Sequence, residues 1–152
     1  MIVVADVPEL NWWLRRFASR ITLRLSPDVV EATSAEGAVH SLPVLAVVRR
    51  DDRTLVAGIG DDPVTDDDAI RIPAFSSSGN LLGSSEAIER LLWWLLKRLP
   101  PSGGFVRPVV IVHGLPSLEG VLGGRQSELV TRALSACGAA AVNPGGSPPA
   151  AA

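Results

Sequence analysis

The sequence predicts an α/β fold in which a β-meander is followed by helices packed against a mixed sheet. Three observations lead to this fold class. Runs of β-type residues, separated by short turns, follow one another over residues 21–59. Residues 85–99 then repeat apolar side chains at helical spacing. Finally, residues 109–112 form a short all-apolar run, and residues 126–136 form a second stretch with helical spacing.

The β-type runs predict a meander of antiparallel strands. They cover residues 21–25, 29–33, 39–48 and 54–59. Residues 26–28, Ser-Pro-Asp, are typical of a turn between the first two strands, and residues 49–53 are expected to form a charged hairpin loop. Pro43 interrupts the third run. Residues 70–73 add a brief extended piece after an acidic loop.

The clearest predicted helix spans residues 85–99. Ser84 or Ser85 is expected to cap its start, and Pro100 comes directly after its end, where a proline stops a helix. The apolar stripe that this helix is expected to bury consists of Ile88, Leu91, Leu92, Leu95 and Leu99.

The rest of the domain is predicted to alternate strands and helix. The run 109–112 is expected to be a central strand buried on both of its faces. The glycine-rich residues 120–124 are interpreted as a flexible connection to the helix over residues 126–136. Residues 139–142 are expected to form a last strand, and residues 143–152, rich in Pro, Gly and Ala, a disordered tail.

Residues 1–20 are predicted to be an N-terminal segment containing an amphipathic helix over residues 9–20, ahead of a domain that spans residues 21–142. The apolar face of this helix carries Leu10, Trp13, Leu14 and Phe17, and the opposite face carries Trp12, Arg15 and Arg16. An apolar face beside arginines suits an anionic membrane surface. Packing on the sheet of its own domain is the alternative interpretation.

The composition is that of a globular domain. The 152 residues are 47% hydrophobic and 20% charged, with a formal net charge of −2. Because no field of one sign is present, nucleic-acid binding is not expected. The single cysteine, Cys137, excludes an internal disulfide and a cysteine-based zinc cage. It is interpreted as a buried thiol in a cytoplasmic protein.

Two other patterns are partly similar to known functional sites. A strand followed by His113 and Gly114 resembles the oxyanion-loop entry of α/β-hydrolases, but the sequence has no G-x-S-x-G elbow and no later histidine. Five acidic residues lack the register of a calcium loop and are interpreted as a solvated loop, so no metal site is expected. They are Asp61, Asp62, Asp66, Asp67 and Asp68.

Several segments resemble those of one protein family. Residues 21–28, Ile-Thr-Leu-Arg-Leu-Ser-Pro-Asp, stand where MreB-type bacterial actins carry I-G-I-D-L-G-T-A. Residues 37–47 resemble the G-x-V-x-x-x-P-S-V-x-A-x segment of that family, and residues 70–99 resemble its I-R-P…D-G-V-I-x-D segment and the helix after it. Residues 107–112 and 134–139 resemble P-R-V-V-I-x-V-P and A-x-x-A-G-A. The resemblance covers subdomain I of the family and implies a ribonuclease-H-like, actin-like half domain.

The family's nucleotide-binding residues are replaced in this sequence. Arg24 stands at the position of the catalytic-cleft aspartate, Ser26 at that of the phosphate-loop glycine and Pro27 at that of the threonine, with Asp28 following. A phosphate loop needs backbone N–H groups that point inward, and proline has none. An arginine in place of the aspartate also removes a carboxylate on the magnesium side. The resemblance therefore implies a degenerate nucleotide site, no catalysis and no bound cofactor.

The expected function is a structural role in bacterial cell shape or morphogenesis. The chain is expected to act through a protein partner or self-association, and through membrane contact at the inner face of the cell membrane. The candidate contact residues are Trp12, Trp13, Leu14 and Phe17 of the N-terminal segment and Trp93 and Trp94 of the long helix. One alternative is a vestigial ATP-binding protein or ATPase, with ATP and magnesium as cofactors, whose cleft a partner completes. A second is a small hydrolase-like enzyme that uses His113.

Overall fold

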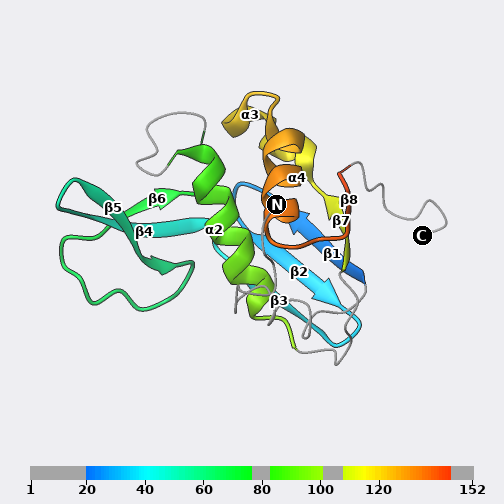
Figure 1. Cartoon of the computed structure of the whole chain (residues 1–152), viewed down its shortest axis with the longest axis horizontal. Helices are drawn as coiled ribbons and strands as arrows, with labels where there is room; N and C mark the ends of the chain where they lie inside the picture. Colours follow the sequence, from blue (N-terminus) through cyan, green and yellow to red (C-terminus); the bar gives the residue numbers. More distant parts are fainter. Residues whose placement is uncertain (1–19, 77–82, 101–107, 145–152) are drawn as a thin grey trace, which may run out of the picture.

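The computed structural model describes residues 20–76, 83–100 and 108–144, which form an α/β fold with two sheets (Figure 1). Its strands are β1 (Arg20–Leu25), β2 (Val30–Ser34), β3 (Gly37–Ser41), β4 (Val44–Arg50), β5 (Arg53–Ile59), β6 (Ile70–Pro73), β7 (Val109–His113) and β8 (Ala141–Asn143). Its helices are α2 (Ser84–Lys97), η2 (Leu115–Leu118, a 3-10 helix), α3 (Glu119–Leu122) and α4 (Gln126–Ala136).

The first sheet is mixed and has the strand order β3-β2-β1-β7-β8. β1, β2 and β3 pair antiparallel, as expected of a meander. β7 pairs parallel with β1, and β8 pairs parallel with β7. A parallel pair needs a crossover between its strands, and α4 lies between β7 and β8 in the chain. The predicted α/β class with a mixed sheet is confirmed.

The second sheet was not predicted. The run 39–48 was expected to be one interrupted strand of a single meander, but it forms two strands, β3 and β4, that belong to different sheets. Pro43 separates them, because it has no N–H for a ladder and its fixed φ turns the chain. β4 then pairs antiparallel with β5 and β6. Asp51 and Asp52, with φ of 53° and 64°, make the tight β4–β5 turn.

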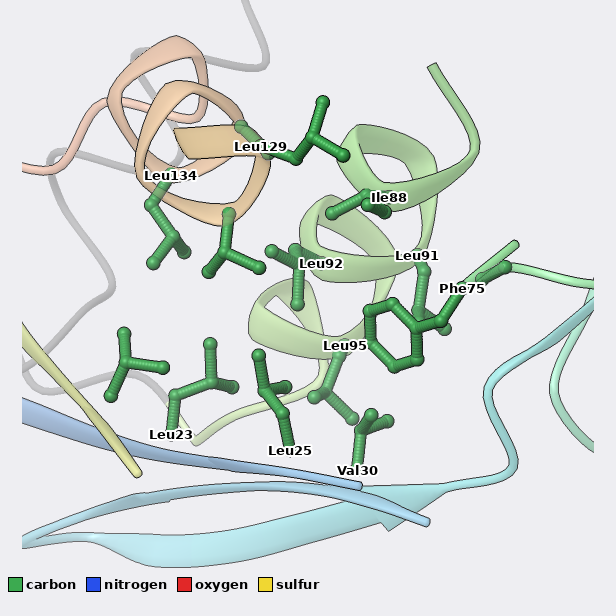
Figure 2. Packing of buried hydrophobic residues seen from close by; sticks show 14 of the residues in the cluster. Leu23, Leu25, Val30, Phe75, Ile88, Leu91, Leu92, Leu95, Leu129 and Leu134 are labelled. Atoms are coloured by element: carbon green, nitrogen blue, oxygen red, sulfur yellow. The ribbon is translucent and has the colours of Figure 1, made fainter. Parts of the chain in front are cut away.

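The core lies between the first sheet and the two long helices (Figure 2). Leu23, Leu25 and Val30 point from the sheet toward α2 and α4. The predicted stripe of α2 is confirmed as buried, and Ala87 and Leu96 join it. The second sheet contributes to the same cluster through Leu45, Val47 and Ile72. α2 therefore packs against both sheets.

The predicted serine cap of α2 is wrong. Gly83 is the N-cap residue, with φ 85°, and no side chain bonds to the first N–H groups of the helix. The hydroxyl of Ser84 donates instead to the backbone carbonyl of Ser76. This bond fastens the start of the helix to the segment after β6.

β7 is not buried on both faces, as its all-apolar sequence had suggested. Val110 and Val112 are buried under the helices, whereas Val109 is 39% exposed and Ile111 is half-buried. Successive strand residues point to opposite faces, and α2 and α4 lie on the same face of this sheet (Figure 2). Within the described residues, the other face therefore has no helix over it.

Residues 120–122 of the glycine-rich stretch are helical, and Gly123 and Gly124 form a turn rather than a longer connection. η2 and α3 fill residues 115–122, and Gly123, with φ 62°, ends α3 by donating its N–H to the carbonyl of Glu119 at 2.8 Å. Glycine allows this left-handed ending. α4 then follows over the predicted residues, and β8 is displaced toward the C-terminus relative to the predicted strand at residues 139–142.

Candidate functional site

The candidate site lies where the parallel strands β1 and β7 end together. Arg24 of β1 is paired with His113 of β7 in the parallel register. The turn at residues 26–28 leaves the end of β1, and Gly114 leaves the end of β7. The predicted phosphate-loop positions thus lie at the end of the first sheet where β1 and β7 finish. We refer to this region as the strand-end site; it contains Arg24, Ser26, Pro27, Asp28, His113, Gly114 and Ser117.

The β1–β2 turn uses its own backbone donors. The Ser26 Oγ accepts the N–H of Asp28 at 3.3 Å and the N–H of Val29 at 3.0 Å. The N–H of Ser26 donates to the Val29 carbonyl at 3.1 Å, and the Ser26 hydroxyl donates to the same carbonyl at 2.9 Å. Pro27 has no N–H. Every N–H of this turn is therefore either absent or bonded within the turn.

Gly114 and Ser117 hold the end of β7 against the end of β1. Gly114 has φ 89°, and a Cβ on it would overlap the carbonyl oxygen of Leu25. The Ser117 hydroxyl donates to the Gly114 carbonyl at 2.6 Å and to the Leu25 carbonyl at 3.2 Å. Gly114 and Ser117 thus both pack against the Leu25 carbonyl, next to the turn.

The charges at the site are mixed and exposed. Arg24 Nε lies 3.9 Å from Glu31 Oε1, and both side chains are partly exposed to solvent. In the sheet register, Arg24 is the neighbour of Glu31 on β2 and of His113 on β7, and Glu31 is the neighbour of His40 on β3. These four residues form a row across the strands. An exposed pair at this distance contributes little stability, about 0–1 kcal/mol. The row brings both histidines of the chain onto the face of the first sheet opposite α2 and α4.

His113 is not paired with a serine in the described part of the strand-end site. Among the described residues, no serine hydroxyl is bonded to His113, and the hydroxyl of Ser117 is directed to backbone carbonyls. A serine nucleophile needs a base within hydrogen-bond reach. In the same part of the chain, no group of three or more His, Cys, Asp or Glu side chains is suited to hold a metal ion.

The acidic loop between β5 and β6 has structural partners. Arg50 Nη2 lies 2.8 Å from Asp66 Oδ2 and 3.4 Å from Asp68 Oδ2. Asp66 Oδ1 also accepts the N–H of Asp68 at 2.9 Å. These contacts fold the loop against β4 and support its interpretation as a loop of ordinary solvated carboxylates.

The two tryptophans of α2 are half-buried. Trp94 donates its Nε1–H to Asp62 Oδ2 at 3.0 Å, and the guanidinium of Arg98 lies 4.8 Å from the centroid of its ring. Trp94 also lies close to Gly60, so the chain after β5 covers it. Trp93 packs against the main core. Trp94 thus joins α2 to the chain that follows the second sheet. These contacts within the chain account for the partial burial of Trp94.

The other candidate contact residues, Trp12, Trp13, Leu14 and Phe17, lie outside the described residues. The predicted tail from Asn143 also falls outside them after residue 144. In the part of the chain that is described, no helix is long and apolar enough to cross a membrane.

Cys137 is buried, as its small-residue surroundings predicted. Burial raises the pKa of its thiol to about 12, and the negative charge of Glu89 adds to the increase. Since the thiolate is the reactive form, a thiol with this pKa is inert at neutral pH.

Sequence reasoning did not find Gly114 and Ser117 as parts of the site. A glycine directly after a buried strand was available as a signal, because such a position often requires φ above zero. The contact that makes glycine necessary is the close approach of Gly114 to the Leu25 carbonyl oxygen, and Ser117 bonds to the same carbonyl from 92 positions away. No local pattern reports either contact. In comparisons with known proteins, no protein-family model matches the chain and no curated protein matches its sequence.

Proposed function

We propose that this chain is a non-catalytic, actin-like structural protein of the MreB type that acts in bacterial cell shape through protein contacts and contact with the inner face of the cell membrane. In this proposal the strand-end site is the remnant of a nucleotide loop. The domain serves as a rigid body that presents surfaces to partners, and its N-terminal segment supplies the membrane contact.

The order of elements supports the actin-like part of the proposal. An antiparallel meander, β1 to β3, is followed by α2, then β7, α4 and β8. This is the order expected of the ribonuclease-H-like half domain that the sequence resembles. The second sheet, β4 to β6, is inserted between β3 and α2 in the chain and leaves this order unchanged.

The observation that carries the non-catalytic part is the closed β1–β2 turn. A phosphate-binding loop must offer free N–H groups, often with glycine allowing a close approach. Here the N–H groups of Ser26, Asp28 and Val29 are bonded within the turn. Opening them for a phosphate would cost those bonds, roughly 1 kcal/mol each. Arg24 has also replaced the carboxylate on the magnesium side.

Calorimetry of the full chain with ATP and magnesium is expected to give no saturable heat up to millimolar nucleotide. The reason is that the turn has no free donor and the edge has no paired carboxylates for the metal. The matched variant is Pro27→Glu, which adds a negative charge in the turn and should give the same flat trace.

Saturable binding by the natural chain would contradict the non-catalytic reading. If Pro27→Glu removed that binding, the strand-end site would be a working nucleotide site, as the vestigial-ATPase alternative requires. If the variant bound equally well, the nucleotide would have another site on this chain.

The membrane part predicts that the chain sediments with anionic phospholipid vesicles and not with neutral ones. Trp13→Glu should abolish sedimentation, because the helical spacing of residues 9–20 puts Trp13 on the apolar face. Trp12→Glu makes the same chemical change on the opposite face and should leave most of the binding. Equal loss of vesicle binding in the two variants, or no sedimentation of the natural chain with anionic vesicles, would contradict the proposed membrane contact.

A further inference from the structure

The face of the first sheet opposite α2 and α4 has a charged part and an uncharged part. The charged part is the row that contains Arg24 and His113, at the strand-end site. The next row across the sheet holds no charged side chain, and we refer to it as the uncharged row. From β3 to β8 its members are Ala38, Thr33, Thr22, Ile111 and Asn143. All five are exposed or half-buried, and α2 and α4 pack on the other face (Figure 2).

The uncharged row lies next to the point where the chain enters the sheet. Arg20 is the first residue of β1, and β1 is the middle strand of the five. In the register Arg20 lies beside Val109, which is 39% exposed, and Val109 lies beside Ala141. Exposed apolar side chains are therefore present beside the place where residues 1–19 join the domain.

Residues 1–19, which lie outside the described residues, have the composition to cover this surface. The apolar face of their predicted helix carries Leu10, Trp13, Leu14 and Phe17. Arg20, which was expected to end this helix, belongs to β1, so Ala18 and Ser19 are available for a turn.

The length of the segment also fits the sheet. A helix over residues 9–17 would be about 14 Å long, which matches three strand spacings of roughly 4.8 Å each. It could therefore lie across neighbouring strands after a turn of two residues. Its attachment to β1 makes the contact intramolecular, so the helix stays at a high effective concentration beside the sheet.

We propose that in the free chain the apolar face of residues 9–17 packs on the uncharged row and Val109, and that an anionic membrane surface competes for the same apolar side chains. Arg15 and Arg16 then point to solvent, because they lie on the opposite side of the helix, and their charges stay hydrated. The two arrangements exclude each other, since each one buries Trp13. The competition rests on the proposed membrane contact, whereas the docking in the free chain does not.

Crosslinking between two introduced cysteines tests the docking in the full chain. Leu14→Cys with Ile111→Cys joins the apolar face of the segment to the uncharged row. Trp12→Cys with Ile111→Cys joins the opposite face of the segment to the same point. If the helix is docked, a short bismaleimide should crosslink the first pair at least ~5-fold faster than the second. Cys137 should not interfere, because it is buried and its thiol has a pKa of about 12.

The matched control moves the second cysteine to the charged row. Leu14→Cys with His40→Cys, at an exposed position on β3, should react no faster than the Trp12 pair. Circular dichroism would verify that all three variants keep the fold. Equal crosslinking rates for the Leu14 and Trp12 pairs with Ile111→Cys would overturn the docking, because a segment that is not docked presents both of its faces equally.

Repeating the crosslinking with phospholipid vesicles tests the competition. Anionic vesicles should slow the pair Leu14→Cys and Ile111→Cys to the rate of the Trp12 pair, and neutral vesicles should leave it unchanged. A chain that sediments with anionic vesicles but crosslinks as fast as in solution would overturn the competition. If the chain binds no vesicles, the proposed membrane contact and the competition both fail, while the comparison in solution still decides the docking.

Discussion

Replacing Gly114 with alanine is expected to lower the free energy of unfolding by about 3 kcal/mol or more. Two causes add at this position. The φ of 89° is unfavourable for any residue with a Cβ. In addition, the new Cβ would overlap the carbonyl oxygen of Leu25, so the ends of β1 and β7 would have to separate. Urea unfolding followed by circular dichroism would measure the loss as a lower midpoint.

Two other glycines separate these causes. Gly124 has φ 88° but open space around its Cβ position, so Gly124→Ala should cost only the backbone strain, about 1 kcal/mol. Gly120 lies in α3 with open space and no positive φ, so Gly120→Ala should be neutral or slightly stabilising. If Gly114→Ala cost no more than Gly124→Ala, the contact between the strand ends would not be the rigid feature described above.

The expected cost at Gly114 bears on the proposed function. The carbonyl of Leu25 belongs to the residue just before the β1–β2 turn, and both Gly114 and Ser117 pack against it. The turn is therefore closed by its own hydrogen bonds and also held from behind. In the proposed function, this corner of the domain is therefore held in a conformation that offers a phosphate no free N–H group.

Local sequence patterns predicted most elements of the fold because these elements are determined by local chemistry. Apolar and polar residues alternate over residues 21–25, and the structure buries the apolar ones, Ile21, Leu23 and Leu25. The apolar stripe of α2 was equally clear. The pairing of β4 could not be predicted, because an interrupted apolar run does not show whether the chain continues in the same sheet. That choice depends on β6, which meets β4 from beyond the acidic loop.

The candidate site, too, could be predicted from the sequence only in its local parts. Arg24, Ser26, Pro27 and Asp28 are neighbours in the sequence, so their place beside one another could be predicted. The hydrogen bonds that close the turn follow from the tendency of serine to bond to nearby N–H groups. The parts brought by β7 could not be predicted, because the parallel pairing of β1 and β7 joins distant segments. The bond from Trp94 to Asp62 is non-local as well, across 32 positions.

Replacing Leu95 with alanine is expected to destabilise the whole described domain by about 3 kcal/mol. Leu95 is fully buried and lies among Leu25, Val30 and the other core side chains (Figure 2). The loss has two parts, the transfer of the removed methyl and methylene groups and the cavity that remains. For a domain of this size, the melting temperature should fall by roughly 6–12 °C.

The position of α2 makes the same variant a test of how the two sheets are joined. One face of α2 packs on the first sheet, and Trp94, one residue before Leu95, is bonded to the chain that leaves β5. Tryptophan fluorescence and far-UV circular dichroism should therefore report one coincident unfolding transition, at a lower midpoint than in the natural chain. Leu55→Ala, at a position 43% exposed on β5, is the control and should cost less than about 1 kcal/mol. Two separated transitions in Leu95→Ala would mean that the second sheet unfolds independently, and that α2 does not unite the fold.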